Sequence, residues 1–209
     1  HSLEGVYGSS FVGRAYLERF YDKRFELQRI MPLDYLEFKG LRVNRGHPFI
    51  DIIGELLDYK NASCRALNRL FDQIRTIFEF IYISPSYSYR TAEVFPKFAL
   101  LPVLIVLSYY EPEQWYEVKC GHSFSSVYNL ASHSKRFLNQ LDSSIIEINE
   151  SAPNESLLSE KSRRDFVDGV CALIYIGKLN DPRVEAVNKG NFLFANTFAD
   201  VFFTLRVQD

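Results

Sequence analysis

An arginine at the start of the strongest predicted helix is placed where it could do chemistry. Arg65 falls in the first turn of a helix expected over residues 63–83. The positive pole of the helix dipole makes a cation mildly unfavourable there. A basic residue at that end suits a nearby anion, because the free N–H groups of a helix N-terminus bind phosphate. The alternative, which stays open, is that Arg65 reaches solvent or a carboxylate such as Asp58.

Other basic residues carry weaker signals. Arg14 belongs to a loose basic group near the N-terminus that could touch a nucleotide or a partner, although an exposed helix face explains it equally well. The basic pairs Lys135–Arg136 and Arg163–Arg164 are interpreted as solvated helix faces. A nucleic-acid role would require a continuous basic face that unites these two pairs.

The cysteines and histidines predict neither a metal site nor a catalytic residue in this chain. The three cysteines, Cys64, Cys120 and Cys171, are far apart and show no CxxC spacing, so we expect reduced thiols. No two histidines are four residues apart, as a helical metal site would need. Cys120 and His122 are near neighbours, but catalytic pairs are usually assembled from distant segments. An enzyme that uses Cys120 or Cys171 would need a perturbed thiol close to a histidine nitrogen.

The common catalytic and nucleotide-binding motifs do not occur in the sequence. It contains no GxxxxGK[ST] loop, GxGxxG, GxSxG or HExxH. The chain starts at His1 rather than at a methionine, and we expect it to be a piece of a longer protein. Any nucleotide-binding loop would then lie outside this chain.

The composition predicts a folded, cytoplasmic chain that binds neither membrane nor nucleic acid. Of its 209 residues, 47% are hydrophobic and 15% aromatic, which is enough for a sizeable core, and the formal net charge is only −2. The most apolar run, residues 98–110, is shorter than the ~20 residues of a membrane span and contains Pro102. We expect a buried core helix there, kinked at the proline.

The hydrophobic periodicity predicts a mainly α fold, an irregular multi-helix bundle with at most a short strand near residues 24–30. Pro32 and Pro48 suit the first turns of two helices, and Asn61 or Ser63 could cap the helix over 63–83. The other helices are expected over residues 12–21, 92–109, 111–120, 123–141, 157–177 and 192–206, with a loop near 149–156.

We expect two subdomains, a helical lid-like part over residues 1–85 and a C-terminal helical part over 86–209. The predicted core residues come from both parts. They are Phe71, Ile74, Phe78, Phe98, Leu101, Leu104 and Leu107.

Two segments within residues 1–80 resemble KAP-family P-loop NTPases. The family has a "YG" pair, a "YL-x-x-F-x-D" helix and an aromatic–leucine strand after its nucleotide-binding core. The matching residues here are Tyr7, Gly8, Tyr16, Leu17, Phe20, Asp22, Phe25 and Leu27, while the "LP" that usually follows is displaced to Met31–Pro32. The second segment resembles the family's "S-x-R-x-[IL]-x-R" helix start, with Ser63, Arg65, Leu67 and Arg69.

The resemblance implies that this chain is the helical lid and relay portion of an ATPase, not catalytic by itself. Its partner would be the upstream P-loop core of the same protein, which binds ATP and Mg²⁺, and many members of the family serve bacterial phage defence. Arg65 would sense nucleotide, with Arg69 and Arg14 as weaker candidates. The resemblance leaves a homo-oligomer or a protein effector open as further partners. The alternative function is a non-enzymatic helical scaffold that binds another protein through its aromatic-rich C-terminal half.

Overall fold

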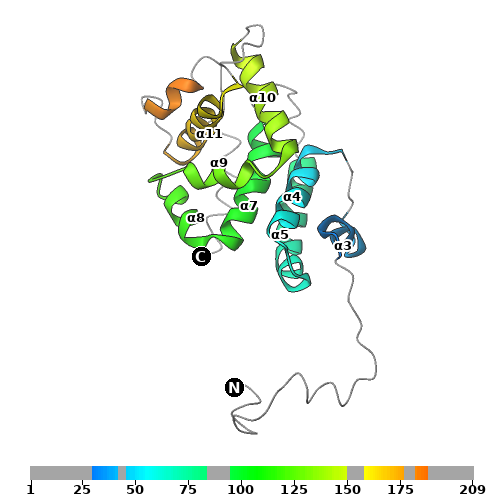
Figure 1. Cartoon of the computed structure of the whole chain (residues 1–209). Coiled ribbons are helices and arrows are strands. Elements are labelled where there is room, and N and C mark those ends of the chain that lie inside the picture. The colour runs from blue at the N-terminus through cyan, green and yellow to red at the C-terminus, as the bar shows by residue number, and fades with distance from the viewer. Residues whose placement is uncertain (1–29, 42–45, 84–94, 150–157, 177–181, 188–209) are drawn as a thin grey trace, which may run out of the picture. The chain divides into compact units, whose positions relative to one another are not determined.

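A computed structural model describes residues 30–41, 46–83, 95–149, 158–176 and 182–187 (Figure 1). Every regular element in these ranges is a helix, which confirms the mainly α prediction. The chain divides into two compact units, His1–Ile30 and Met31–Asp209, and all the helices below belong to the second. The elements predicted at 12–21, 24–29 and 192–206 lie outside the described residues, as do Arg14 and residues 150–157 of the expected loop.

The two helices that the sequence predicted to begin at Pro32 and Pro48 do so. They are α3 (Pro32–Phe38) and α4 (Pro48–Tyr59). Proline fits a first helical position because its fixed φ is already helical and its missing N–H would have no partner there. The next helix, α5 (Cys64–Ile83), is capped by Ser63, whose Oγ accepts a hydrogen bond from the Ala66 N–H at 3.2 Å.

The predicted continuous helix over 92–109 is divided in the structure. A π-helix, η1 (Phe95–Leu100), leads into α7 (Leu101–Tyr110), and residues 92–94 are not described. Pro102 is the second residue of α7 and has no N–H to donate to Phe98, so the regular i→i−4 ladder is interrupted there. The sequence predicted a kink at Pro102, and the structure changes from π-helix to α-helix directly before this proline. The stretch from Leu101 to Leu107 is fully buried.

The prediction of one helix over 123–141 is wrong. After α8 (Pro112–Lys119), the chain forms α9 (Ser125–Ala131) and then α10 (Lys135–Asn149). The break follows from Ser134, whose Oγ accepts a hydrogen bond from the Phe137 N–H at 3.0 Å and so starts a new helix. The sequence placed the end of the helix at Leu141, but α10 continues because Ile145 is buried in the core.

The last described helices confirm the predicted helix over 157–177 and add a short one. In α11 (Glu160–Tyr175), the Oγ of the cap residue Ser159 accepts a hydrogen bond from the Ser162 N–H. A 3₁₀-helix, η3 (Pro182–Ala186), packs along α11. The contact is close because Gly169 has no side chain: a Cβ there would lie 2.6 Å from the Arg183 carbonyl oxygen.

One continuous hydrophobic core joins these helices. Helix α7 contacts α4, α8, α9 and η1, and α4 also contacts α10 (Figure 1). The predicted core residues are buried, except for Phe98, which is partly buried. The predicted subdomain boundary at residue 85 lies outside the described residues, but helices from both sides of it share this core. No helix in the described part of the chain is long and apolar enough to cross a membrane.

Candidate functional site

The start of α5 presents two arginines to solvent. Arg65 and Arg69 lie one turn apart on the helix, and both are exposed. Ser63 satisfies one of the free N–H groups of this helix end. Among the described residues, Arg65 has no hydrogen-bond or ion-pair partner, and Asp58 does not pair with it. The site can therefore stabilise a negative charge, but Arg65 offers no proton transfer because a guanidinium stays protonated.

The third arginine of α5, Arg75, contacts neighbouring side chains of its own helix. Arg75 lies 3.9 Å from the Asp72 carboxylate and its guanidinium is 5.5 Å from the centre of the Phe71 ring. Lys39, next to α3, approaches the same ring at 5.9 Å. Cation–π contacts of this kind keep the charge near its own helix surface. On α5, positive charge without a described partner is thus confined to the first turns, at Arg65 and Arg69.

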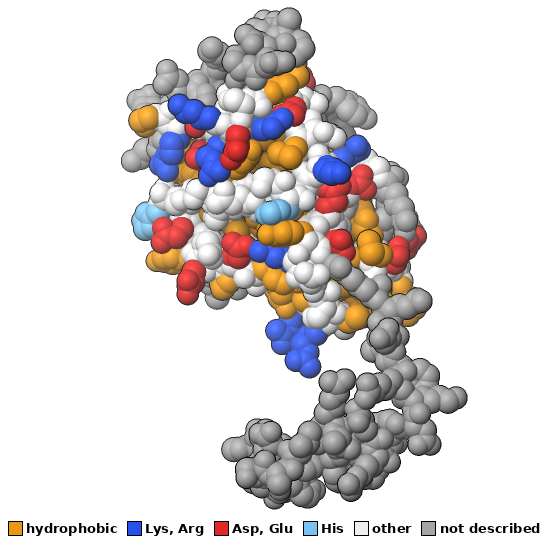
Figure 2. Space-filling view, in the orientation of Figure 1, with side chains coloured by type: hydrophobic (Ala, Val, Ile, Leu, Met, Phe, Trp, Pro, Cys, Tyr) orange, Lys and Arg blue, Asp and Glu red, His pale blue; other side chains and the backbone are white. Residues whose placement is uncertain are grey.

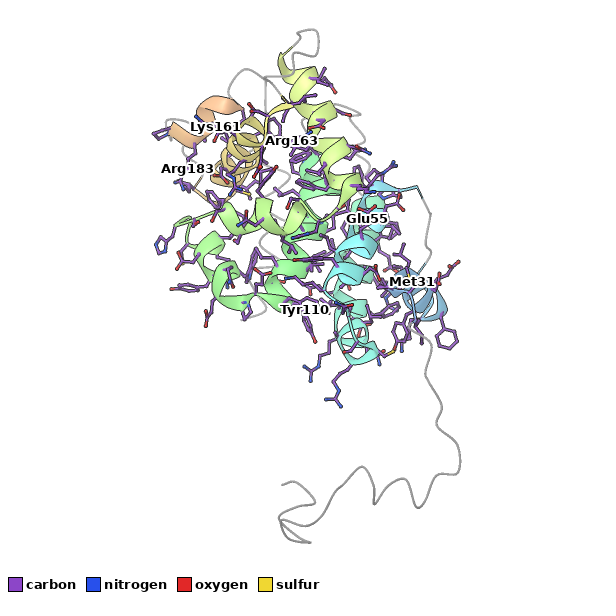
Figure 3. All side chains as sticks on the ribbon, in the orientation of Figure 1. Met31, Glu55, Tyr110, Lys161, Arg163 and Arg183 are labelled. Carbon is purple, nitrogen blue, oxygen red and sulfur yellow. The ribbon has the colours of Figure 1, made fainter. Side chains whose placement is uncertain are left out.

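A partly buried polar junction joins α4 to the start of α10. The Glu55 Oε2 accepts a 2.6 Å hydrogen bond from the Ser134 hydroxyl and a 3.2 Å bond from the Arg136 N–H. Figure 3 shows Glu55 where these helices meet. A carboxylate suits this position because a helix N-terminus carries partial positive charge. Sequence reasoning missed Glu55, since nothing local links it to a serine 79 positions away.

Arg136 extends this junction to the start of α4. Its Nη2 donates to the Gly46 carbonyl oxygen at 2.7 Å, and its Nε lies 3.6 Å from the Asp51 carboxylate. Asp51 in turn accepts a hydrogen bond from the Gly46 N–H at 3.1 Å. Arg136 thus contacts a backbone carbonyl and a carboxylate at the start of α4, while 37% of its side chain stays exposed. We call the group of Glu55, Ser134, Arg136, Asp51 and Gly46 the α4–α10 junction.

His47 lies beside the α4–α10 junction among aromatic rings. Its imidazole meets the edges of Phe78 and Phe98, with ring centres 5.5 and 4.9 Å apart. Burial lowers the pKa of His47 below its usual 6.5, partly opposed by the nearby Asp51 carboxylate and reinforced by Arg136. The neutral imidazole is the form that this environment favours.

Two basic residues of α11, Arg163 and Arg164, lie beside carboxylates. Arg163 makes two 2.7 Å hydrogen bonds to Asp142 of α10, and these bonds raise the Arg163 pKa. Arg164 lies 3.3 Å from Glu160 and stacks over the Tyr128 ring. Arg136 lies beside the Asp51 carboxylate in the same way, so each of the two basic pairs contains at least one arginine next to a carboxylate.

The cysteines do not resemble activated nucleophiles. Cys171 is completely buried, and burial raises its thiol pKa well above the usual value, with a further contribution from Asp168. A nucleophilic thiol needs the opposite shift. Exposed Cys120 shares a hydrogen bond with the Tyr116 hydroxyl, which raises the pKa of Tyr116, while His122 lies 3.6 Å from Glu117. In the described ranges, no cluster of three His, Cys, Asp or Glu side chains could hold a metal ion.

Asp168 of α11 is the described carboxylate with the least satisfied environment. Its Oδ1 is inaccessible to solvent and accepts no hydrogen bond from another described residue. Burial raises the Asp168 pKa, with Arg164 and Arg183 opposing the shift. Arg183 itself donates to the Gly121 carbonyl oxygen at 3.2 Å and stacks over Phe124.

Comparisons with known proteins found no match. No protein-family model matches the chain, and no curated protein or solved structure is significantly similar to it. A function must therefore be argued from the residues themselves and from their arrangement. Of the three arginines singled out in the sequence, Arg65 and Arg69 come together at the start of α5, and Arg14 lies outside the described residues.

Proposed function

We propose that this chain is the helical lid and relay portion of a KAP-type P-loop ATPase that serves bacterial phage defence. The observation that supports the proposal best is the exposure of Arg65 at the capped start of α5, without a described carboxylate partner. A residue in that position is available to a phosphate from another part of the protein. The sequence resemblance in residues 1–80 points to the same arginine.

The proposed role of Arg65 is electrostatic. When the upstream core holds ATP and Mg²⁺, the Arg65 guanidinium stabilises negative charge on the terminal phosphate, and the N–H groups of the α5 start add to the field. Arg69 lies one turn further along the same helix and strengthens that field. The phosphate-binding lysine and the Mg²⁺-binding carboxylate belong to the core in this proposal, so the chain does not hydrolyse ATP alone.

A relay from this site can follow contacts between the helices. Lys60, at the end of α4, forms a 2.5 Å ion pair with Glu111, the residue before α8. Since Lys60 is only three residues before Ser63, a displacement of the α5 start reaches α8 through this pair. Helix α4 also connects to α7 and α10 through the core. A movement of the lid would therefore be transmitted to the C-terminal helices.

The test is steady-state ATP hydrolysis by the protein that contains the P-loop core. Arg65→Ala should lower kcat about 100-fold, as expected when one donor to a developing charge is removed. Arg75→Ala is the matched control on the same helix and should leave kcat nearly unchanged, because Arg75 is engaged with Asp72 and Phe71. Unchanged kinetics in Arg65→Ala, or ATP turnover by the 209-residue chain alone, would contradict the proposal.

A second candidate, a protein-interaction scaffold, is favoured by exposed apolar side chains at the two ends of α3. Phe38, the last residue of the helix, is 85% exposed, and Met31, directly before it, is 51% exposed. A pair of this kind can contact another protein. If hydrolysis is unaffected by Arg65→Ala while Phe38→Ser abolishes a stable complex in gel filtration, the scaffold explains the chain better.

A further inference from the structure

Two helix starts of opposite charge lie on the same side of the molecule. The Lys60–Glu111 ion pair, at 2.5 Å, joins the end of α4 to the start of α8. Helix α5 begins four residues after Lys60, and α8 begins directly after Glu111. The ion pair thus links the two segments that lead directly into α5 and α8.

The charges on these two helix starts are complementary. The α5 start exposes Arg65 and Arg69, whereas α8 exposes Glu113 and Glu117, one turn apart. Figure 2 shows acidic side chains gathered over α8, at the lower left, and basic side chains at the bottom, over the start of α5. Glu117 also faces His122 at 3.6 Å, and its side chain stays half exposed. One surface thus carries a basic half and an acidic half.

Exposed tyrosines accompany these charges. Tyr59 is 45% exposed and directly precedes Lys60, and Tyr116 is 60% exposed between the two glutamates of α8. Tyr59 is held in place by a parallel stack with His133, with ring centres 3.7 Å apart. Tyrosine and arginine are the residue types enriched at protein–protein contacts, because they bury a large area at a low entropy cost. This surface has the composition of an interface.

We propose that a second copy of this chain docks on this surface through a two-fold axis. A half-turn rotation places the basic half of one copy, Arg65 and Arg69, on the acidic half of the other, Glu113 and Glu117. The same contact then occurs twice, as in any isologous dimer. Exposed ion pairs contribute little each, so the dimer is weak and sensitive to salt.

This proposal needs no nucleotide and does not depend on the proposed ATPase function. Its tests leave Arg65 unchanged, so a failure here would not count against the nucleotide-sensing role. Sedimentation equilibrium of the 209-residue chain at low ionic strength should give twice the 24.3 kDa monomer mass. In ~1 M salt, where the Debye length is about 3 Å, the mass should return to that of the monomer.

Charge reversal identifies the interface. Arg69→Glu, or Glu113→Lys with Glu117→Lys, should each weaken the dimer at least tenfold. Lys161 is an exposed residue of α11, labelled at the upper left of Figure 3. Lys161→Glu makes the same change of charge away from the proposed interface and should leave the dimer unchanged. Circular dichroism checks that each variant keeps its helices. A monomer at about 1 mM protein, or a dimer that none of the reversals weakens, would overturn the proposal.

Discussion

The α4–α10 junction and the α5 start use the same residue type in opposite ways. In the junction, the Arg136 guanidinium reaches a backbone carbonyl oxygen and a carboxylate. At the α5 start, Arg65 has no such partner among the described residues. An arginine with such partners holds helices together, whereas one without them is available to a ligand or another protein. The comparison distinguishes residues that stabilise the fold from residues that are available for binding, and three predictions test it.

The largest effect on stability is expected at Glu55. Glu55→Ala leaves the Ser134 hydroxyl and the Arg136 N–H without their shared acceptor and removes a favourable charge from the start of α10. The free energy of unfolding should fall by about 2–3 kcal/mol, as for hydrogen bonds to charged groups. Urea denaturation measures this loss. Glu113→Ala, at an exposed position of α8, should change the free energy of unfolding by less than about 0.5 kcal/mol. If both variants lost the same free energy, the α4–α10 junction would not be more important for stability than the exposed surface.

A smaller difference is expected between two arginine substitutions. Arg136→Ala removes the bond to the Gly46 carbonyl oxygen and the contact with Asp51, so it should cost about 1–2 kcal/mol of unfolding free energy. Arg69→Ala removes an exposed side chain and should cost less than about 0.5 kcal/mol. Thermal unfolding of both variants at one pH makes the comparison. If Arg69→Ala were the more destabilising variant, the α5 start would have a structural role.

The smallest effect concerns the pH dependence beside the junction. Because the folded-state pKa of His47 is lowered, the unfolded chain binds the proton more readily below pH ~6.5. The stability contribution of His47 is present above that pH and is lost as the pH falls through the lowered pKa. His47→Gln should therefore flatten the decline in melting temperature between pH ~7 and ~5. His133→Gln, at an exposed histidine, is the control; an unaltered slope in His47→Gln would contradict the assignment.

The elements that the sequence predicted well are specified by neighbouring residues. Pro32, Pro48 and Ser63 act within the first turn of the helix that each one starts, so their effect needs no knowledge of the fold. The break at Ser134 was missed because the apolar pattern continues through it. Part of what stabilises the break is Glu55, which is distant in sequence.

The same limit applies to the candidate site. The position of Arg65 at a helix start followed from periodicity and a cap, both of which are local. Whether an arginine has a carboxylate partner depends on which helices meet, and for this reason the contacts of Arg136 with Gly46 and Asp51 could not be predicted. The acidic face of α8 was likewise missed, because its relation to the α5 start depends on the pairing of Lys60 with Glu111.

Gly169 sets the register of η3 along α11. A Cβ at this position would lie 2.6 Å from the Arg183 carbonyl oxygen and 2.8 Å from the Val187 Cγ2, so any side chain here would push η3 away from this place on the helix. The hydrogen bond from Arg183 to the Gly121 carbonyl oxygen depends on this close packing. The missing side chain at Gly169 therefore affects how η3 is joined to the turn between α8 and α9.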